Sequence, residues 1–422
     1  MIGLYLLIFF IILLLGCPVP ISMSISVVLW LVTTPNMPDL VMAQKMFAAN
    51  DSFALMAVPF FMLSGQLMER TGITDKIVRF SQSLVGHIKG GLAHTTLLTG
   101  VIMAGISGSS NADAAAIGSI LLKPLKQDGY EDGIAVSIVA AAGCLGPIIP
   151  PSILMILYAD IAGVSIAKLF MCGVVPGLLM ALGWMIISYI YAKRRNMGAT
   201  KFAGWLTVWK EFCSAIGALV MPIIIVGGIL TGIVTCTEAG VLAVVYGILY
   251  GLFTRNLKLS DLRESLIHAI RASANPLLII ATAKMFSYLL SRNGVTSAIS
   301  NFCLTYIHSE LAFFFFLLIL GIFLGMFIDT TASMLMLTPV LLPVAQAMGI
   351  DVLTFSIIFL LSLLTAGLTP PVGVLFYVVA AIDNTPIRKV VGVIWYYAIV
   401  MMLVIILLFF FPQLSTGLAS LI

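Results

Sequence analysis

The chain has 422 residues, of which 61% are hydrophobic and only 9% are charged, and its formal net charge is +4. A soluble domain carries about 25% charged residues, so this composition excludes an ordinary water-soluble protein. It indicates a polytopic membrane protein with roughly ten to twelve spans and partial spans, and the basic residues lie in short loops, which does not favour a nucleic-acid partner.

The order of apolar runs predicts an all-α fold. The first run has no Lys or Arg before it, unlike a signal peptide, so we expect it to be retained as the first helix. Two polar-flanked amphipathic stretches, 38–51 and 257–271, are expected to lie along the membrane interface. Helices are predicted over 2–15, 21–34, 53–68, 93–106, 111–124, 133–147, 151–162, 168–191, 212–233, 238–254, 273–290, 311–327, 332–346, 353–367, 371–382 and 392–411.

The two halves of the chain share landmarks at a spacing of 220 residues. Gly105 is matched by Gly325, Ala112 by Ala332, Leu121-Leu122 by Leu341-Leu342, Gly129 by Gly349, and Pro150-Pro151 by Pro370-Pro371. Internal repeats of this size are typical of secondary transporters. We therefore predict a first repeat over 1–191, a linker over 192–211 and a second repeat over 212–422.

The distribution of Lys and Arg predicts that these repeats are inverted. Cytoplasmic loops of membrane proteins carry an excess of Lys and Arg, so the linker, with five of these residues, is placed in the cytoplasm. When the helices are followed outward from the cytoplasmic linker, every basic loop falls on the cytoplasmic side only if 93–124 and 311–346 are re-entrant hairpins. Each hairpin then starts and ends on the same side of the membrane. The basic loops are 69–92, 123–132, 254–271 and 383–391, and their poorer counterparts are 289–312, 343–352, 34–51 and 160–168. The prediction is a bacterial inner-membrane protein with both termini in the periplasm.

Two breaks interrupt the apolar runs of the first repeat. Unsatisfied backbone groups cost several kcal/mol in lipid, so such breaks persist only where protein or a wet cavity receives them. The segment 105–113 offers hydroxyls, an amide and free carbonyls to a small cation, and the helix that starts near Ser110 offers N–H groups to an anion. In the unwound span 143–152, Pro residues free backbone carbonyls. For the segment 105–113 the alternative is an ordinary capping turn, and for the span 143–152 the alternative is a packing kink.

The segment 105–113 is the expected tip of the first re-entrant hairpin. The second repeat supplies a matching tip at 325–332 and a matching unwound span at 365–373. Together these segments predict paired sites near the membrane midplane. Asp113 and Asp329 are functional candidates because they are carboxylates within apolar surroundings, with helix capping as the alternative. Lys284 either pairs with a substrate carboxylate or Asp329, or extends outward from its helix. Glu238 is predicted to be a helix cap.

The motifs together resemble one family, the large (DctM-type) membrane subunit of tripartite ATP-independent periplasmic (TRAP) transporters. The resemblance runs along essentially the whole chain. It is carried by Gly-Ile-Ser-Gly-Ser-Ser at 105–110, Pro-Pro-Ser at 150–152, Thr-Glu-Ala at 237–239 and Thr-Pro-Pro-Val-Gly at 369–373. Cys236 and Gly240 depart from the commoner Pro and Ala, which we expect to affect packing only.

The resemblance implies a sodium-coupled elevator transporter with a scaffold and a moving transport domain. It implies a small four-helix membrane subunit and a periplasmic substrate-binding protein as partners, and a dicarboxylate or sugar acid as cargo. The first implied sodium site comprises Ser107, Ser109, Gly146, Ile149 and Pro151, and the second comprises Gly325, Gly367 and Thr369. Substrate is expected near Asn111, Asp113, Ser152 and Asp329.

Other functions are weighed against this one. No GxxxxGK[ST] motif is present, so ATP use is not predicted, and sodium ions are the only expected coupling species, with no cofactor. An enzyme is not predicted, because the apolar segments show no nucleophile–base pair and no set of metal ligands. The main alternative is a stand-alone sodium–anion symporter that needs no binding protein.

Overall fold

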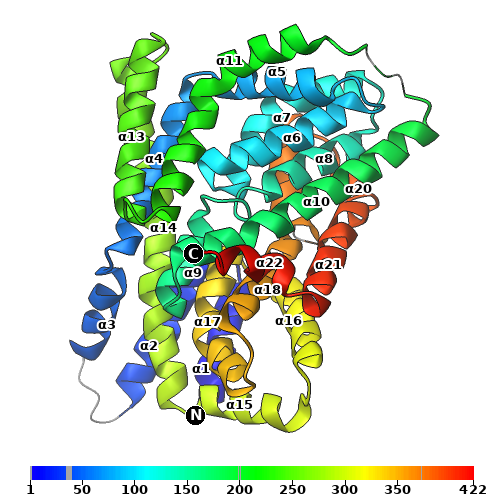
Figure 1. The fold of residues 1–422 in the computed structure, drawn as a ribbon. Helices are drawn as coiled ribbons and strands as arrows, with labels where there is room; N and C mark the ends of the chain where they lie inside the picture. The colour runs from blue at the N-terminus through cyan, green and yellow to red at the C-terminus, as the bar shows by residue number, and fades with distance from the viewer. Residues whose placement is uncertain (1, 35–39, 198, 200, 372) are drawn as a thin grey trace.

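The computed structural model describes residues 2–34, 40–197, 199, 201–371 and 373–422. Within these ranges the chain is helical and contains no strand (Figure 1). Pro38 and Asp39 of the first interfacial stretch, residues 198 and 200 of the linker, and Val372 of the second unwound span lie outside the described residues. The all-α class predicted from the sequence is confirmed.

The helices follow one another with few long connections. In chain order they are α1 (Ile2–Leu14), α2 (Val19–Thr33), α3 (Leu40–Asn50), η1 (Ala54–Met56), α4 (Ala57–Arg70), α5 (Ile73–Val85), α6 (Gly91–Ser107), α7 (Ser110–Gln127), α8 (Asp132–Cys144), α9 (Ile153–Ala162), α10 (Ile166–Arg194), α11 (Trp205–Pro222), η2 (Ile223–Gly227), α12 (Gly228–Leu230), α13 (Cys236–Phe253), α14 (Leu259–Arg292), α15 (Val295–Tyr306), α16 (Glu310–Gly325), α17 (Thr330–Ala347), α18 (Val352–Thr365), η3 (Ala366–Leu368), α19 (Val374–Ile382), α20 (Ile387–Val391), α21 (Trp395–Phe410) and α22 (Gln413–Ala419).

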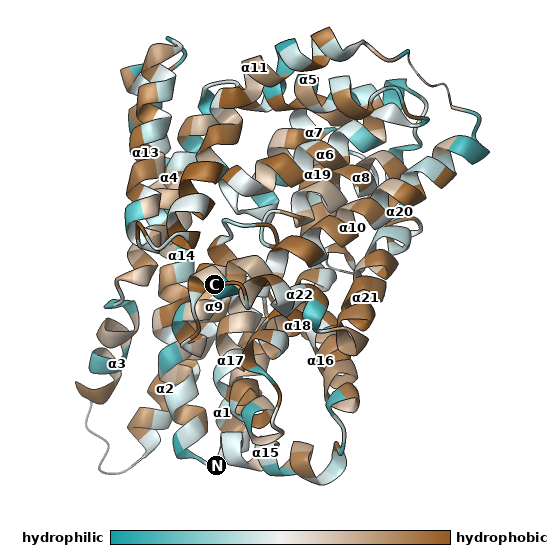
Figure 2. Cartoon of the chain, viewed as in Figure 1, coloured by the Kyte–Doolittle hydropathy of each residue, from teal (hydrophilic) through white to brown (hydrophobic). Residues whose placement is uncertain are grey.

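Five helical stretches of the described chain are long and apolar enough to cross a membrane: α10, α11 through α12, α13, α14 and α17. The number rises to seven if the bent pairs α3–α4 and α21–α22, with bends of 62° and 71°, each count as one span. Seven further apolar helices have 10–17 residues, fewer than the ~20 that a span needs. Apolar residues run along the outer helices, including α10 and α21 (Figure 2).

Two predictions about helix boundaries are wrong. The stretches 257–271 and 273–290 form the single 34-residue helix α14 rather than an interfacial helix and a span. Ala272-Ser273 changes the polarity of the chain but contains no helix breaker, so the helix continues through it. The basic loop 69–92 contains α5, an amphipathic helix that buries Ile73, Ile77 and Val78, and 289–312 contains α15.

The breaks between helices divide the molecule into an upper and a lower part in Figure 1. Helices α6, α7 and α8 lie in the upper half, with α5 and α11 across the upper end, whereas α16 and α17 lie in the lower half, with α15 across the lower end. Helix α4 packs against α13 and α14 at one side of the molecule. The N-terminus lies at the lower end, and the C-terminus lies at mid-height near α22.

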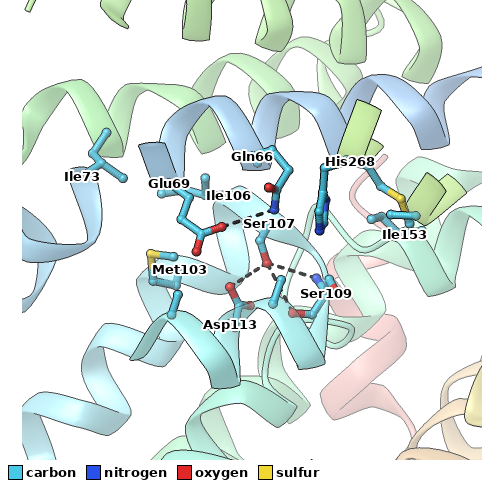
Figure 3. Close-up of a pocket in the computed structure, with 15 residues that line it drawn as sticks. Gln66, Glu69, Ile73, Met103, Ile106, Ser107, Ser109, Asp113, Ile153 and His268 are labelled. Carbon is cyan, nitrogen blue, oxygen red and sulfur yellow. Dashed lines mark hydrogen bonds between the residues drawn. The ribbon is translucent and has the colours of Figure 1, made fainter. Parts of the chain in front are cut away.

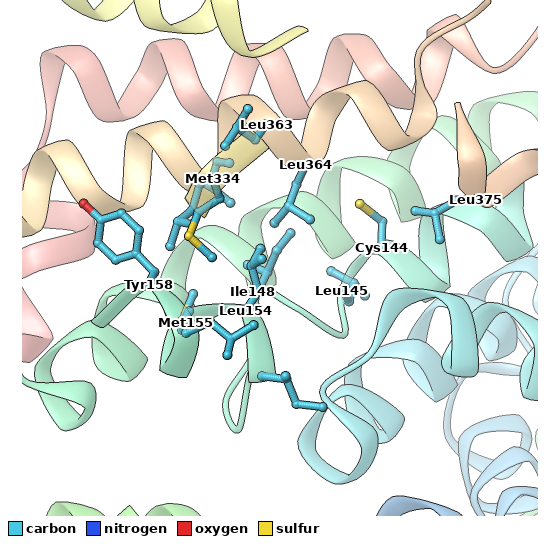
Figure 4. Packing of buried hydrophobic residues seen from close by; sticks show 14 of the residues in the cluster. Cys144, Leu145, Ile148, Leu154, Met155, Tyr158, Met334, Leu363, Leu364 and Leu375 are labelled. Carbon is cyan, nitrogen blue, oxygen red and sulfur yellow. The ribbon is translucent and has the colours of Figure 1, made fainter. Parts of the chain in front are cut away.

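The interior is packed where the helix breaks of the two halves meet (Figure 4). Leu145 and Ile148, which follow α8, are buried, as are Leu364 of α18 and Leu375 of α19. The Ser356 hydroxyl donates a hydrogen bond of 2.9 Å to Tyr158 Oη, which ties α18 to α9. In a bilayer, lipid tails are as apolar as Leu, so close packing and such hydrogen bonds stabilise this arrangement.

Candidate functional site

Four segments that connect α-helices, one of which contains η3, converge on one cavity of about 220 Å³, called here the break cavity. Two segments join α6 to α7 and α16 to α17, and the other two join α8 to α9 and α18 to α19. Helix α14 closes one side with Asn275, Pro276 and Ile279. From the four segments and the helix ends beside them, the lining includes Gly108, Ser109, Ser110, Asn111, Pro147, Gly325, Ile328, Asp329, Thr330, Thr331 and Gly367. A cavity between segments so distant in sequence is a candidate binding site.

The N-terminus of α7 presents backbone N–H groups to the break cavity. Its N-cap residue, Ser109, makes no side-chain capping hydrogen bond, and Ser109, Ser110 and Asn111 all line the cavity. The first N–H groups of a helix lack partners within the helix, and the helix dipole favours negative charge there. This end of the cavity therefore suits an anionic group such as a carboxylate.

The N-terminus of α17 differs because a carboxylate already occupies it. Asp329 Oδ2 accepts hydrogen bonds from the backbone N–H groups of Thr331 and Ala332, at 2.9 and 3.4 Å. Capping, one of the two roles considered for Asp329, is therefore present. The side chain is also exposed and lines the break cavity, so its negative charge faces any bound molecule.

Asp113 lies on the other side of the first tip, in a group called here the Asp113 cluster: Ser107, Ser109, Asp113 and Gly146. Figure 3 shows the first three of these residues. Its carboxylate is fully buried. Ser107 Oγ donates a hydrogen bond of 2.6 Å to Asp113 Oδ1, whereas Oδ2 has no partner. Asp113 does not cap α7, because Ser109 holds the N-cap position. A buried carboxylate with a free oxygen is stabilised by a nearby cation or by taking up a proton.

Backbone geometry brings the first unwound span close to the Asp113 carboxylate. A Cβ added to Gly146 would lie 2.6 Å from Asp113 Oδ2 and 3.0 Å from the Ser109 carbonyl carbon. The backbone of the first unwound span thus reaches the cluster because it has no side chain there. Carboxylate, hydroxyl and carbonyl oxygens beside an unwound helix are the donor set that holds Na⁺ in membrane transporters. The described residues include no trio of His, Cys, Asp or Glu that could hold a metal ion.

The remaining residues of the first implied sodium site lie close to the tip but play different parts. The Pro151 carbonyl oxygen faces Gly108, where an added Cβ would lie 2.6 Å from it. Gly108 has a φ of +62°, a left-handed conformation that favours glycine. The Ile149 side chain packs against Gly177 of α10 instead. Ser107, Ser109 and Gly146 are thus brought together, with Pro151 beside them.

The second implied sodium site contains no carboxylate equivalent to Asp113. Gly325 and Gly367 line the break cavity, and the buried Thr369 hydroxyl donates to the Thr365 carbonyl at 2.8 Å. The residue 220 positions after Asp113 is Ser333, which is buried and whose hydroxyl has no hydrogen-bond partner. Ser333 is not among the residues predicted from the sequence, although the 220-residue spacing points to it.

Three predicted substrate residues, Asp113, Ser152 and Lys284, do not line the break cavity. The buried Ser152 caps α9: its hydroxyl accepts from Met155 N at 3.2 Å and donates to the Pro147 carbonyl at 2.7 Å. Lys284 is exposed on α14, and no ion pair joins it to Asp329 in the part of the chain that the structure describes. Asn275 was missed, and the Asn-Pro pair inside an apolar helix is the signal that identifies it. Glu238 forms a capping box with Thr235, as predicted.

Comparisons with known proteins agree with this architecture. The sequence model of the family described as "Tripartite ATP-independent periplasmic transporter, DctM component" matches residues 6–414. The sialic acid TRAP transporter large permease protein SiaM of Vibrio cholerae is 34% identical over 372 residues, covering 88% of this chain and 87% of that protein. The C4-dicarboxylate TRAP transporter large permease protein DctM of Pseudomonas aeruginosa is 36% identical over 361 residues, covering 83% of each.

A third relative, the 2,3-diketo-L-gulonate TRAP transporter large permease protein YiaN of Escherichia coli, is 34% identical and covers 81% of each chain. Among solved structures, the Alcanivorax borkumensis YdaH transporter superposes with a TM-score of 0.64 at 13% identity, over 87% of this chain and 86% of that one. At that identity the superposition shows a shared fold alone.

Proposed function

Since this chain belongs to the DctM component family of tripartite ATP-independent periplasmic transporters, in which its relatives are large permease proteins, we propose that it imports a small organic carboxylate driven by a sodium gradient. The proposal places the chain in the bacterial inner membrane with both termini in the periplasm. It rests on one observation above all: the uncapped N-terminus of α7 faces a cavity at which all four helix breaks meet.

The substrate class follows from the chemistry of the break cavity. The N–H groups of α7 suit a carboxylate, and Asn111 and Thr331 supply polar side chains for hydroxyl or carbonyl oxygens. Relatives are named for sialic acid, 2,3-diketo-L-gulonate and C4-dicarboxylate. A carboxylate with a short oxygenated chain, either a dicarboxylate or a sugar acid, is the common chemistry that fits.

The Asp113 cluster supplies the proposed coupling to sodium. Asp113 is buried beside the tip whose other side faces the break cavity. Without a cation, the buried carboxylate repels an incoming anion, and charges interact strongly where the dielectric constant is low. A sodium ion at Ser107, Ser109, Asp113 and Gly146 removes that repulsion and orders the tip, so sodium binding precedes carboxylate binding.

We place a second sodium ion near Gly325, Gly367 and Thr369, by analogy between the two halves. The matched helices support this analogy: α17 (Thr330–Ala347) repeats α7 (Ser110–Gln127) at a spacing of 220 residues. The buried, unpartnered Ser333 hydroxyl takes the position of Asp113 there. The second ion lacks a carboxylate ligand and therefore binds more weakly than the first.

Alternating access is proposed to occur by an elevator movement. The counterparts α5 and α15 lie across opposite ends of the molecule, which supports inverted repeats (Figure 1). The break cavity lies between α14 and the segments of both tips. In this mechanism α4, α13 and α14 belong to the scaffold, and the two tips move past them with their bound ions and carboxylate.

The proposed partners are a small four-helix membrane subunit and a periplasmic substrate-binding protein. The description "large permease protein" that several relatives carry supports a separate small permease. The tripartite name of the family supports the binding protein. A stand-alone sodium–anion symporter is the second candidate, and it predicts uptake without either partner.

The test is uptake by proteoliposomes that hold this chain and its small partner, with an inward sodium gradient and radiolabelled dicarboxylates and sugar acids. Uptake that needs sodium and the binding protein supports the proposal and identifies the cargo. Sodium-driven uptake without the binding protein supports the symporter. Equal uptake with potassium in place of sodium overturns the sodium coupling.

A further inference from the structure

A second, smaller cavity of about 80 Å³ lies between α4, α14 and the first tip, and it is called here the Glu69 cavity (Figure 3). Gln66 and Glu69 enter it from α4, and His268 enters it from α14. Ser107 and Asp113 line its other side. It shares four lining residues with the break cavity: Met62, Ser109, Ile153 and Ala272. The two cavities are therefore neighbours on either side of one tip.

The Glu69 cavity is lined by two carboxylates, and neither forms an ion pair within the part of the chain that the structure describes. Asp113 is fully buried with one oxygen unpartnered. Glu69 accepts a hydrogen bond of 3.2 Å from Gln66 and forms no ion pair with any described residue. The neighbouring Arg70 instead pairs with Glu264 at 2.9 Å and Asp261 at 3.6 Å, both on α14. Arg70 is thus held by two acids of α14.

At the same tip, the two cavities favour ions of opposite charge. The uncapped end of α7 favours an anion in the break cavity, whereas two carboxylates in a cavity partly shielded from water attract cations and repel anions. The carboxylate oxygens of Glu69, the amide oxygen of Gln66 and the Ser107 hydroxyl are hard ligands suited to a partly hydrated monovalent cation. The Asp113 cluster, the proposed sodium site, opens on this side.

We propose that the coupling cation and the organic anion reach the first tip through different cavities, and that Glu69 binds the sodium ion transiently on its way to Asp113. This inference rests on the proposed sodium coupling but adds a second, peripheral cation site and a separate route. Met62 and Ile153 lie between the routes, so neither ion has to pass the binding position of the other.

The test compares initial uptake rates across a sodium titration, applied to either face of proteoliposomes that hold the chain and its small partner. The variants are Glu69→Gln and Glu69→Lys. The matched control is Asp75→Asn, which removes an exposed acid of α5 that lines neither cavity. Choline chloride keeps the ionic strength constant across the titration. This is needed because salt screens the attraction between sodium ions and surface charges beyond about 8–10 Å at physiological ionic strength.

We expect Glu69→Gln to lower the rate several-fold at limiting sodium on one face, with recovery at saturating sodium. Glu69→Lys should lower the rate further, while the half-saturating substrate concentration at saturating sodium stays within twofold of wild type. The control Asp75→Asn should behave as wild type. Thermal unfolding of the purified variants checks that both are folded. Glu69→Gln alone carries the test if the lysine variant fails to fold.

The separate-route inference is overturned if both Glu69 variants keep the sodium dependence of the wild type, or if they shift the substrate dependence as much as the sodium dependence. An Asp113→Asn variant distinguishes this failure from failure of the proposed function. If Asp113→Asn loses sodium dependence and the Glu69 variants keep it, only the route is wrong. If Asp113→Asn also behaves as wild type, the sodium site itself is wrong.

Discussion

At the scale of single residues, the second helices of the two tips begin at matching positions, but the tips differ in charge. Asp113 places a buried carboxylate beside the first tip, and its counterpart Ser333 places a neutral hydroxyl beside the second. Asp329 lies at the second tip but caps α17 and faces the break cavity. The structure therefore assigns different tasks to two aspartates that the sequence treats alike.

Gly146→Ala tests the Asp113 cluster without changing any charge. The added Cβ would lie 2.6 Å from Asp113 Oδ2, in the space that the proposed sodium ion occupies. We expect the half-saturating sodium concentration for uptake to rise by about tenfold or more, equivalent to about 1.4 kcal/mol. Gly417→Ala, where an added Cβ meets nothing within 4 Å, is the control. A Gly146→Ala protein with unaltered sodium dependence would remove the cluster from the cation site.

Asp329 can be separated into its capping and binding roles by two substitutions. Asn caps a helix about as well as Asp, whereas Ala costs about 1 kcal/mol. We expect Asp329→Asn to keep the thermal stability of the wild type and Asp329→Ala to lose stability. Both should weaken uptake, since both remove the charge that faces the break cavity. Wild-type uptake by Asp329→Asn would show that capping is the only role of this residue.

At the scale of helices, the sequence predicts breaks well and continuity poorly. The breaks around Gly108 and Pro150 are marked by residues that alter backbone freedom or remove an N–H donor. Helix α14 was divided wrongly because polarity changes near Ala272, whereas the helix itself continues from Leu259 to Arg292. Helix α5 was overlooked because its buried residues follow a helical period within a charged segment, which a reading by mean hydropathy does not detect.

Gly100 controls how closely α6 lies against α8. A Cβ added there would lie 2.6 Å from the Ala142 carbonyl oxygen and 2.9 Å from its Cα, and backbone cannot move aside as a side chain can. We expect Gly100→Ala to destabilise the fold by about 1–3 kcal/mol, the usual cost of overpacking. Thermal unfolding of the purified protein measures this effect.

The control for Gly100 is Gly3→Ala in α1, where an added Cβ has nothing within 4 Å. Replacing a helical Gly by Ala favours the helix by roughly 0.5–1 kcal/mol, so this variant should unfold at the same or a higher temperature. Equal melting temperatures for wild type and Gly100→Ala would mean that α6 has room to shift away from α8.

At the scale of the whole molecule, the sequence predicted which segments carry chemistry but not what surrounds them. Asn275, Glu69 and His268 reach the two cavities from α4 and α14, and nothing in their local sequence says which tip they face. Lys284 was selected on charge alone, yet its position on α14 leaves it exposed and away from the break cavity. Such placements depend on tertiary packing, which local patterns do not encode.

The elevator proposal predicts that α9 moves past the α3–α4 break. In the structure, Ser52 in that break donates a hydrogen bond to Asp160 of α9, and neither residue lines the two cavities. Oxidative cross-linking of Ser52→Cys with Asp160→Cys, in a Cys213→Ser background, should reduce uptake more than tenfold. Reductant should restore it, and each single variant should transport. Full uptake by the cross-linked protein would show that these segments stay together during transport.

The most direct test of the central claim is the affinity of the purified permease pair for its carboxylate, measured as a function of sodium concentration. A sodium ion that neutralises Asp113 and orders the tip must strengthen carboxylate binding, and the carboxylate must strengthen sodium binding by the same factor. We predict an increase of at least tenfold between sodium-free and saturating conditions, lost in Gly146→Ala. An affinity that is the same with and without sodium would contradict the account.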